Sequence, residues 1–169
     1  MKKIFAILLA CILAMSAGAL AATYTYPDCD FTFDYNEDFF EITMDDHTDD
    51  EDLVILTDKN GGGIRIHLGE LRDGETFPTA EELAKTWNVE VETMEAWGNF
   101  KNVLCYQITN EDGIYEAVFL APVYDDDGSE IHDILTVTIT GKPIEDEDAA
   151  MESSDWISEV VNTLKVVDD

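Results

Sequence analysis

Residues 103–140 decide the fold class, and they read VLCYQITNEDGIYEAVFLAPVYDDDGSEIHDILTVTIT. Three long apolar segments are separated by two short groups of turn residues, at 110–113 (NEDG) and 125–128 (DDDG). In the last segment, residues 131–140, apolar side chains alternate with threonines, which is the period of a strand with one buried face. Consecutive strands joined by such turns predict an antiparallel sheet built of hairpins.

The N-terminal half continues the same pattern. Residues 31–35 (FTFDY) alternate apolar and polar side chains, and residues 39–42 (FFEI) begin a second predicted strand. The apolar run 53–56 (LVIL) is followed by Asn60-Gly61, a strong hairpin signal, and residues 64–68 (IRIHL) alternate again. These segments predict further strands of one antiparallel sheet.

Two segments carry helical spacing instead. Thr79 and Glu82 form a capping box at the start of the first. Its apolar face is expected to hold Ala80, Leu83, Ala84 and Trp87. Acidic residues precede the second helix and Lys165 is expected to end it. Its apolar residues are Trp156, Ile157, Val160, Val161 and Leu164. The predicted class is α+β: an antiparallel β-sheet of consecutive hairpins with two amphipathic helices packed on it.

Residues 1–21 are predicted to be a cleavable secretory signal peptide. Lys2 and Lys3 precede a short apolar run, and small residues lead up to Ala21. An uncleaved anchor is disfavoured because the run is shorter than the ~20 residues of a spanning helix, and lipid attachment at Cys11 is a further, weaker alternative. Residues 23–169 contain no repeat or linker, so they predict a single acidic α+β domain, located in the periplasm or outside the cell.

The charge of this domain limits its partners. The chain of 169 residues has 38 acidic and nine basic residues, a formal charge of −29. Removing Lys2 and Lys3 with the signal leaves seven basic residues and a charge of −31. Nucleic acids and anionic membrane surfaces would be repelled, so we expect neither nucleic-acid binding nor membrane insertion after cleavage. Cations, basic proteins, neutral ligands or cell-wall material remain, although acidity can simply keep an exported monomer soluble.

Cysteine and histidine positions predict no site. Export permits a disulfide between Cys29 and Cys105, but the sequence leaves open whether they meet or stay as thiols. His67 and His132 lie in predicted strands, so a pair with Cys105 is conceivable, but their alternation favours outward-facing side chains. These two histidines and His47 lack zinc-ligand spacing. We therefore expect no catalytic residue, no metal ligand and no cofactor.

Two acidic segments could hold calcium weakly. In residues 125–130 (DDDGSE), aligning Gly128 with the glycine of an EF-hand loop puts Val123 and Ile134 at the first and last ligand positions, so that motif fails. Residues 45–52 (DDHTDDED) are expected to form a charged loop outside the core. Aspartate and glycine are ordinary turn residues, which favours solvated turns at both places.

Three tryptophans could line a ligand site, but two of them have positions typical of a core. Trp87 and Trp156 fall on the apolar faces of the predicted helices, which favours core positions. Trp97 precedes Gly98 at a predicted turn and is the one that could line a sugar or peptide site.

The layout resembles the PsbP-like group, which includes periplasmic DcrB-type domains. The matching features are Phe31-Thr32-Phe33 after Tyr26-Pro27, the turn at Asn60-Gly61, the capped helix from Thr79, the long strands over 103–140, and the closing helix ending at Leu164. The resemblance implies a sheet with helices packed on it and a binding or accessory role. Members of the group differ in function, so no site residue is carried over.

The expected function is therefore a secreted, non-catalytic binding or accessory domain with an unknown protein or envelope partner. Two alternatives remain open. One is a carboxylate-dependent hydrolase, for which 38 acidic residues offer chance pairs but no recognisable motif. The other is a calcium-stabilised extracellular domain.

Overall fold

The computed structural model describes residues 21–25, 29–48, 51–72, 74–109, 114–125, 128–141 and 147–167, except the side chain of Glu147. Its elements are β1 (Ala22–Tyr24), β2 (Phe31–Tyr35), β3 (Phe40–His47), β4 (Glu51–Asp58), β5 (Gly63–Glu70), α2 (Ala80–Trp87), β6 (Val91–Trp97), β7 (Phe100–Thr109), β8 (Tyr115–Tyr124), β9 (Ile131–Gly141), α3 (Glu147–Thr163) and β10 (Lys165–Val166). The predicted signal peptide lies outside the described residues apart from Ala21, so its cleavage stays a prediction.

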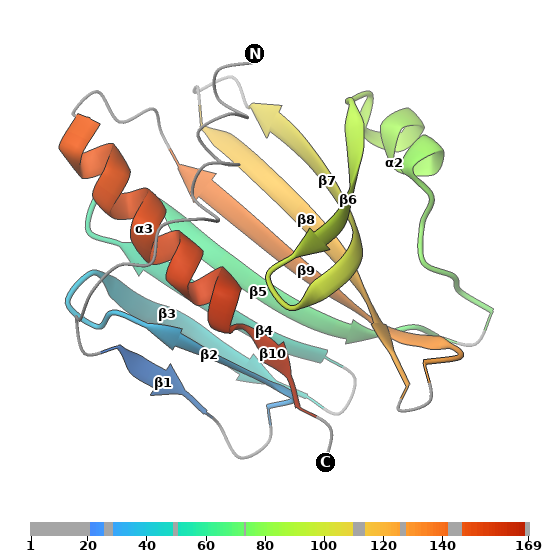
Figure 1. Ribbon diagram of the computed structural model, residues 1–169, viewed down its shortest axis with the longest axis horizontal. Coiled ribbons are helices and arrows are strands. Elements are labelled where there is room, and N and C mark those ends of the chain that lie inside the picture. The colour runs from blue at the N-terminus through green and yellow to red at the C-terminus, as the bar shows by residue number, and fades with distance from the viewer. Residues whose placement is uncertain are drawn as a thin grey trace.

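The dominant feature is a seven-stranded antiparallel sheet in the order β3-β4-β5-β9-β8-β7-β6 (Figure 1). A smaller group of three strands has β2 in the middle, antiparallel to the N-terminal β1 and the C-terminal β10. Helix α3 packs against β2, and α2 lies beside β6. A mostly antiparallel sheet with two helices in the described residues confirms the predicted α+β class.

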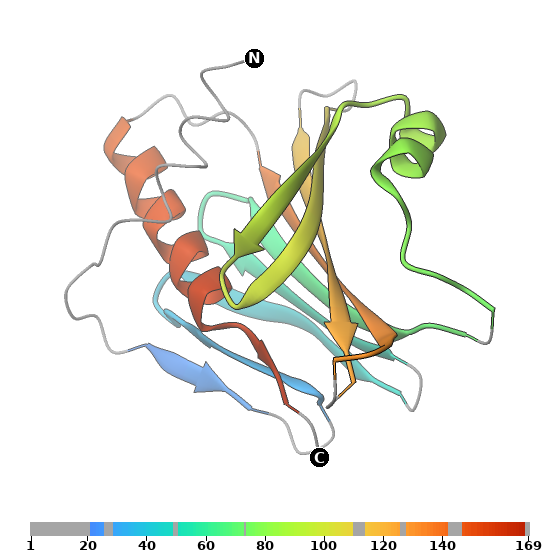
Figure 2. The ribbon, with the colours of Figure 1, turned by 45° about the vertical axis from the view of Figure 1, so that its right-hand side comes forward.

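The core lies on the concave face of the large sheet, which curls around α3 (Figure 2). Strand alternation places one side chain in two on this face. In β9, Leu135 and Val137 are fully buried, while Thr136 and Thr138 on the other face are half-buried. The helix contributes Val160 and, just after its end, Leu164, both without exposed surface. Apolar burial between the sheet and this helix is the main source of stability.

The turn between β6 and β7 closes the curl by meeting the end of α3. The side-chain amide of Asn99 donates hydrogen bonds to the carbonyl oxygens of Asn162 (3.2 Å) and Leu164 (2.8 Å), which the helix itself leaves unpaired. Gly98 has φ +58°, and a Cβ atom there would lie 2.6 Å from the carbonyl oxygen of Val161. This turn therefore needs glycine for its conformation and for the close approach.

Two features predicted from the sequence, the turn between β4 and β5 and the start of α2, are held by local hydrogen bonds. The carboxylate of Asp58 accepts the backbone N–H groups of Asn60 and Gly62, which forms the turn between β4 and β5. At α2 the capping box is present: the Thr79 hydroxyl accepts the Glu82 N–H, and the Glu82 carboxylate accepts the Thr79 N–H.

The acidic segment 45–52 does not have the structure that its sequence predicts. It was expected to be a loop outside the core, but residues up to His47 belong to β3 and Glu51 and Asp52 begin β4. Asp52 is only 4% exposed. This burial is tolerated because the Asp52 carboxylate is bonded to the His47 ring and to a backbone N–H group. A prediction from the hydrophobicity of single residues does not include such partners.

Two tryptophans and one lysine also differ from expectation. Trp87 is 53% exposed and stacks on Tyr106, with ring centroids 6.4 Å apart, whereas Leu83 is the residue of α2 that is buried, in a small cluster with side chains of β7 and β8. Trp97 is 5% exposed and stacks on Phe119 at 4.2 Å, so it is a core residue rather than a ligand platform. Lys165 does not end α3: it pairs in β10, and the last turn of the helix has no basic residue.

Candidate functional site

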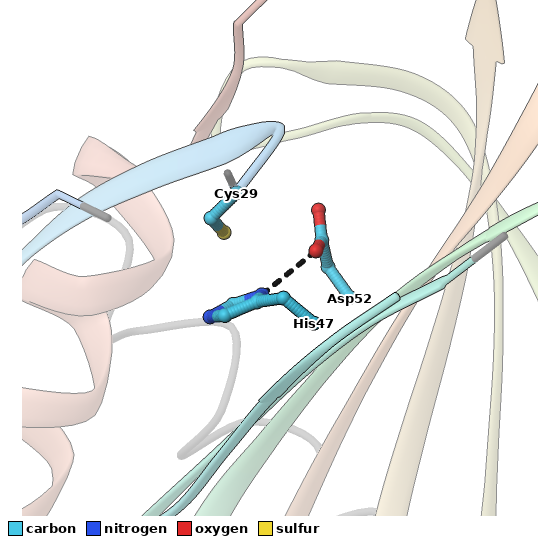
Figure 3. Close-up of side chains that lie close together, drawn as sticks. All are labelled: Cys29, His47 and Asp52. Carbon is cyan, nitrogen blue, oxygen red and sulfur yellow. Dashed lines mark hydrogen bonds and ion pairs between the residues drawn. The ribbon is translucent and has the colours of Figure 1, made fainter. Parts of the chain in front are cut away.

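Side chains capable of chemistry from separate segments meet where β3 ends and β4 begins. Tyr24 ends β1, Cys29 precedes β2, His47 ends β3 and Asp52 lies near the start of β4. Figure 3 shows the last three pointing toward one another. Their potential ligand atoms, one sulfur, one nitrogen and one oxygen, all lie within 4.8 Å of each other.

Strand pairing explains why these polar groups face inward. His47 lies opposite Asp52 in the β3–β4 ladder, and Asp45 lies opposite Val54. Val54 is fully buried in the core, and residues two apart in a strand share a face. Asp45, His47 and Asp52 therefore occupy core-facing positions at the end of the sheet that β1 and β2 cover.

The His47 ring is held at both nitrogens. Nδ1 lies 2.7 Å from Oδ1 of Asp52, and Nε2 lies 2.6 Å from Oδ1 of Asp45. The Tyr24 hydroxyl donates to the same Asp45 oxygen at 2.6 Å and lies 2.9 Å from Nε2. The other oxygen of Asp52 accepts the backbone N–H of Asp30 at 2.8 Å. The ring orientation is thus set by two carboxylates that are themselves positioned.

These partners decide the protonation of the ring. Burial alone lowers the pKa of His47, but the hydrogen bonds and charges of Asp52 and Asp45 outweigh it, so the pKa is raised above its ordinary value. In the imidazolium form, which the two carboxylates favour, both nitrogens donate. The pKa of Tyr24 is also raised, first by burial and then by its hydrogen bond to Asp45, so the hydroxyl remains a donor.

Cys29 stays a neutral thiol in this setting. Burial raises its pKa to about 12, against a lowering by a backbone hydrogen bond at Phe31, and the charges of Asp52 and Asp30 add to the rise. A nucleophilic cysteine needs the opposite environment, with a lowered pKa and a basic nitrogen facing the sulfur. The nitrogens of His47 face carboxylates instead. The arrangement is suited to holding a group rather than to attacking one.

The other cysteine and histidines lie elsewhere. Cys29 and Cys105 are both free thiols, and Cys105 is buried in the core on β7. His67 bonds to Glu51 at 2.9 Å on the opposite face of the sheet, and His132 is exposed beside Asp133. The conceivable pairing of Cys105 with either histidine is therefore not formed.

The acidic turn after β8 is satisfied internally where it is described. The Asp125 carboxylate accepts hydrogen bonds from the N–H and hydroxyl of Ser129 and from the N–H of Glu130. Residues 126–127 and 49–50 lie outside the described residues. Weak calcium binding at either acidic segment stays a prediction.

The cluster was not predicted from the sequence, because Cys29 and His47 are 18 residues apart. Cys29 precedes β2, whereas His47 ends β3. One signal was nevertheless present. Alternation through Asp52, Val54 and Leu56 puts all three on one face, and the two apolar residues are core types. Extending that face backward by two residues places Asp52 at a core-facing position, from which a buried polar site follows.

No family model matches the chain, and no curated protein matches it. The PsbP-like resemblance therefore stays a prediction. Within the described residues, none of the helices has the length and apolar character needed to span a bilayer.

Proposed function

We propose that this chain is a secreted, non-catalytic binding or accessory domain of the cell envelope or extracellular space. In this proposal an antiparallel sheet of hairpins, closed by two amphipathic helices, acts as a rigid frame for the cluster at the end of β3 and β4. The single observation that carries the proposal is the double clamp on His47, with a carboxylate at each ring nitrogen.

The clamp supports binding over catalysis for a chemical reason. A cysteine–histidine hydrolase needs one ring nitrogen free to take the thiol proton and the other held by an orienting group. Here both ring nitrogens of His47 face carboxylates, which raise its pKa and favour the doubly protonated ring, and the raised pKa of Cys29 keeps the sulfur neutral. Neither residue is in the protonation state that the reaction requires, whereas both can be displaced from their partners by a bound group.

Thiol reactivity tests the proposal. The purified protein is treated with iodoacetamide at several pH values, and alkylation of Cys29 and Cys105 is followed separately by peptide mass spectrometry. Both thiols are expected to react slowly at pH 7, with rates that rise as pH approaches their raised pKa values of about 12 and about 11. Rapid, pH-independent alkylation of Cys29 near neutrality would show an activated nucleophile and overturn the non-catalytic assignment.

Export and binding are tested separately. Cell fractionation with N-terminal sequencing is expected to find the protein outside the cytoplasm and beginning just after Ala21. A full-length chain retained in the cytoplasm contradicts export. Binding is measured as a rise in melting temperature with cations, neutral sugars and basic peptides, because a ligand of the native state stabilises it by mass action. Binding of none of these classes, together with turnover of a substrate, contradicts the proposal.

A further inference from the structure

The cluster brings three different donor types together from three segments. The sulfur of Cys29, the ring nitrogen of His47 and the carboxylate of Asp52 lie within 4.8 Å of each other, and the exposed fractions are only 7% for the His47 side chain and 4% for Asp52. We propose that the cluster is a site for a zinc-class divalent metal ion, bound by Cys29 Sγ, His47 Nδ1 and Asp52 Oδ1. This inference rests on the binding function proposed above and names its ligand.

The groups around the donors support this assignment independently. A histidine that binds a metal usually donates its other ring N–H to a carboxylate, which fixes the ring and strengthens the ligand. His47 has this arrangement: Nε2 faces Asp45, whose oxygen also accepts the Tyr24 hydroxyl. The second oxygen of Asp52 is likewise held, by the Asp30 N–H. Both ligands are oriented from behind, with the remaining donor atoms turned toward Cys29.

The donor set selects among metals. Calcium and magnesium bind oxygen ligands, so a thiol and an imidazole do not suit them. Zinc accepts sulfur, nitrogen and carboxylate oxygen together, and cobalt and nickel tolerate the same mixture. Three protein ligands leave one position of a tetrahedral ion for water or for a group on a partner.

Binding requires local shifts of up to about 1 Å, because donors as far apart as 4.8 Å must approach and the hydrogen-bonded pair must separate. A tetrahedral zinc ion separates its ligand atoms by about 3.3–3.7 Å, because its bonds are about 2.0–2.3 Å long. Nδ1 and Oδ1 now lie 2.7 Å apart as a hydrogen bond, so the two atoms must separate by less than about 1 Å as the ion takes the place of the proton. The Nδ1 proton and the Cys29 thiol proton both leave to solvent, as metal binding to such ligands demands.

Cobalt provides a direct probe of the sulfur ligand. The purified full chain, with thiols reduced, is titrated with Co²⁺ in a millimolar magnesium background that occupies weak acidic sites. One equivalent is expected to produce a sulfur-to-cobalt charge-transfer band and visible bands of tetrahedral intensity. Zn²⁺ is then expected to displace the cobalt and abolish both sets of bands.

The chain offers matched controls. Cys29→Ala is compared with Cys105→Ala, which removes a buried thiol elsewhere, and His47→Gln is compared with His67→Gln, which removes a carboxylate-bonded histidine on the outer face. Only Cys29→Ala is expected to abolish the charge-transfer band. Loss of a hydrogen-bond partner behind a metal ligand typically weakens affinity by roughly 10–100-fold, so loss of a ligand itself in either site variant should weaken zinc affinity by more than that. Both control variants should bind zinc as tightly as the parent protein.

A measurement on the unaltered chain covers the case in which a site variant fails to fold. Zn²⁺ is expected to protect Cys29 from alkylation at alkaline pH while Cys105 in the same molecule keeps its rate. Absence of the cobalt–sulfur band, unchanged affinity in Cys29→Ala, or equal protection of both cysteines overturns the metal assignment. Those outcomes leave the non-catalytic binding function standing, since that proposal is overturned by a fast-reacting Cys29 and not by failure to bind metal.

Discussion

Replacing His47 by leucine in metal-free protein is expected to cost more stability than replacing Asp52 by asparagine. Both changes remove the opposite charges that face each other across the 2.7 Å contact between Nδ1 and Oδ1. They differ in the charge left behind, because the Asp52 side chain is 4% exposed. The size of each effect depends on whether the remaining group keeps another partner of opposite charge.

The two losses can be estimated from the charge that each change leaves without a partner. Without His47, the Asp52 carboxylate keeps one backbone donor and is 4% exposed, so a buried charge has lost its counter-charge. His47→Leu is therefore expected to lose about 3–4 kcal/mol, in the range for breaking a buried ion pair. Asp52→Asn leaves no buried charge without a partner, because Asp45 still faces Nε2 of His47, so this change should lose about 1–2 kcal/mol, mostly one hydrogen bond.

Urea denaturation at pH 7 with a chelator present measures both free energies of unfolding. His67→Leu is the matched control, because its partner Glu51 is 58% exposed and the pair is expected to contribute less than about 1 kcal/mol. The reasoning is refuted if Asp52→Asn is the more damaging of the two, or if His67→Leu costs as much as His47→Leu.

Three further predictions concern the frame around the site. Gly98→Ala should destabilise the fold by about 2–3 kcal/mol in urea denaturation, because φ is +58° and the new Cβ would lie 2.6 Å from the Val161 carbonyl oxygen. Glu159→Gln should stabilise the protein by roughly 1 kcal/mol at pH 7, because burial and then the charge of Asp34 raise the Glu159 pKa and one of its oxygens is buried without a partner. The Glu159 carboxyl binds its proton more tightly in the native state than in the unfolded state. Its contribution to stability is therefore fully present below its ordinary pKa and is lost as pH rises through the raised pKa. The gain in Glu159→Gln should accordingly vanish in acid, which is checked by measuring the melting temperature against pH. Trp97→Leu should lose about 3 kcal/mol and also quench the near-ultraviolet circular dichroism of the stacked pair, and an unchanged spectrum would contradict its core position.

The antiparallel sheet could be predicted because its signals are local. Alternation in residues 131–140 and turn residues at Asn60-Gly61 act over neighbouring positions, and the capping box at Thr79 lies within one helical turn. Non-local pairings were not accessible in the same way. Strand β1 was not predicted, and Lys165 was assigned to a helix end although it pairs with Thr32 of β2, which lies far away in sequence.

The candidate site could not be predicted, for a related reason. Hydropathy treats Asp45 and Asp52 as surface residues one at a time, and only the fold shows that His47 lies between them with Tyr24 and Cys29 adjacent. The energy of a buried charge depends on its partners, and those partners come from four segments. Apart from the two-residue alternation through Asp52, the information exists only in three dimensions.

The position of β2 has a consequence for how the chain reaches its folded state. Phe31 and Phe33 are each 1% exposed, yet β2 pairs only with β1 and with residues 165–166 of β10. Helix α3, which directly precedes β10 in the chain, packs against β2. A nascent chain thus cannot cover this strand until residues 147–166 have been synthesised. The segment beside Cys29 would then be ordered after β3 and β4, so an ion could be captured at the proposed metal site only after α3 and β10 are in place.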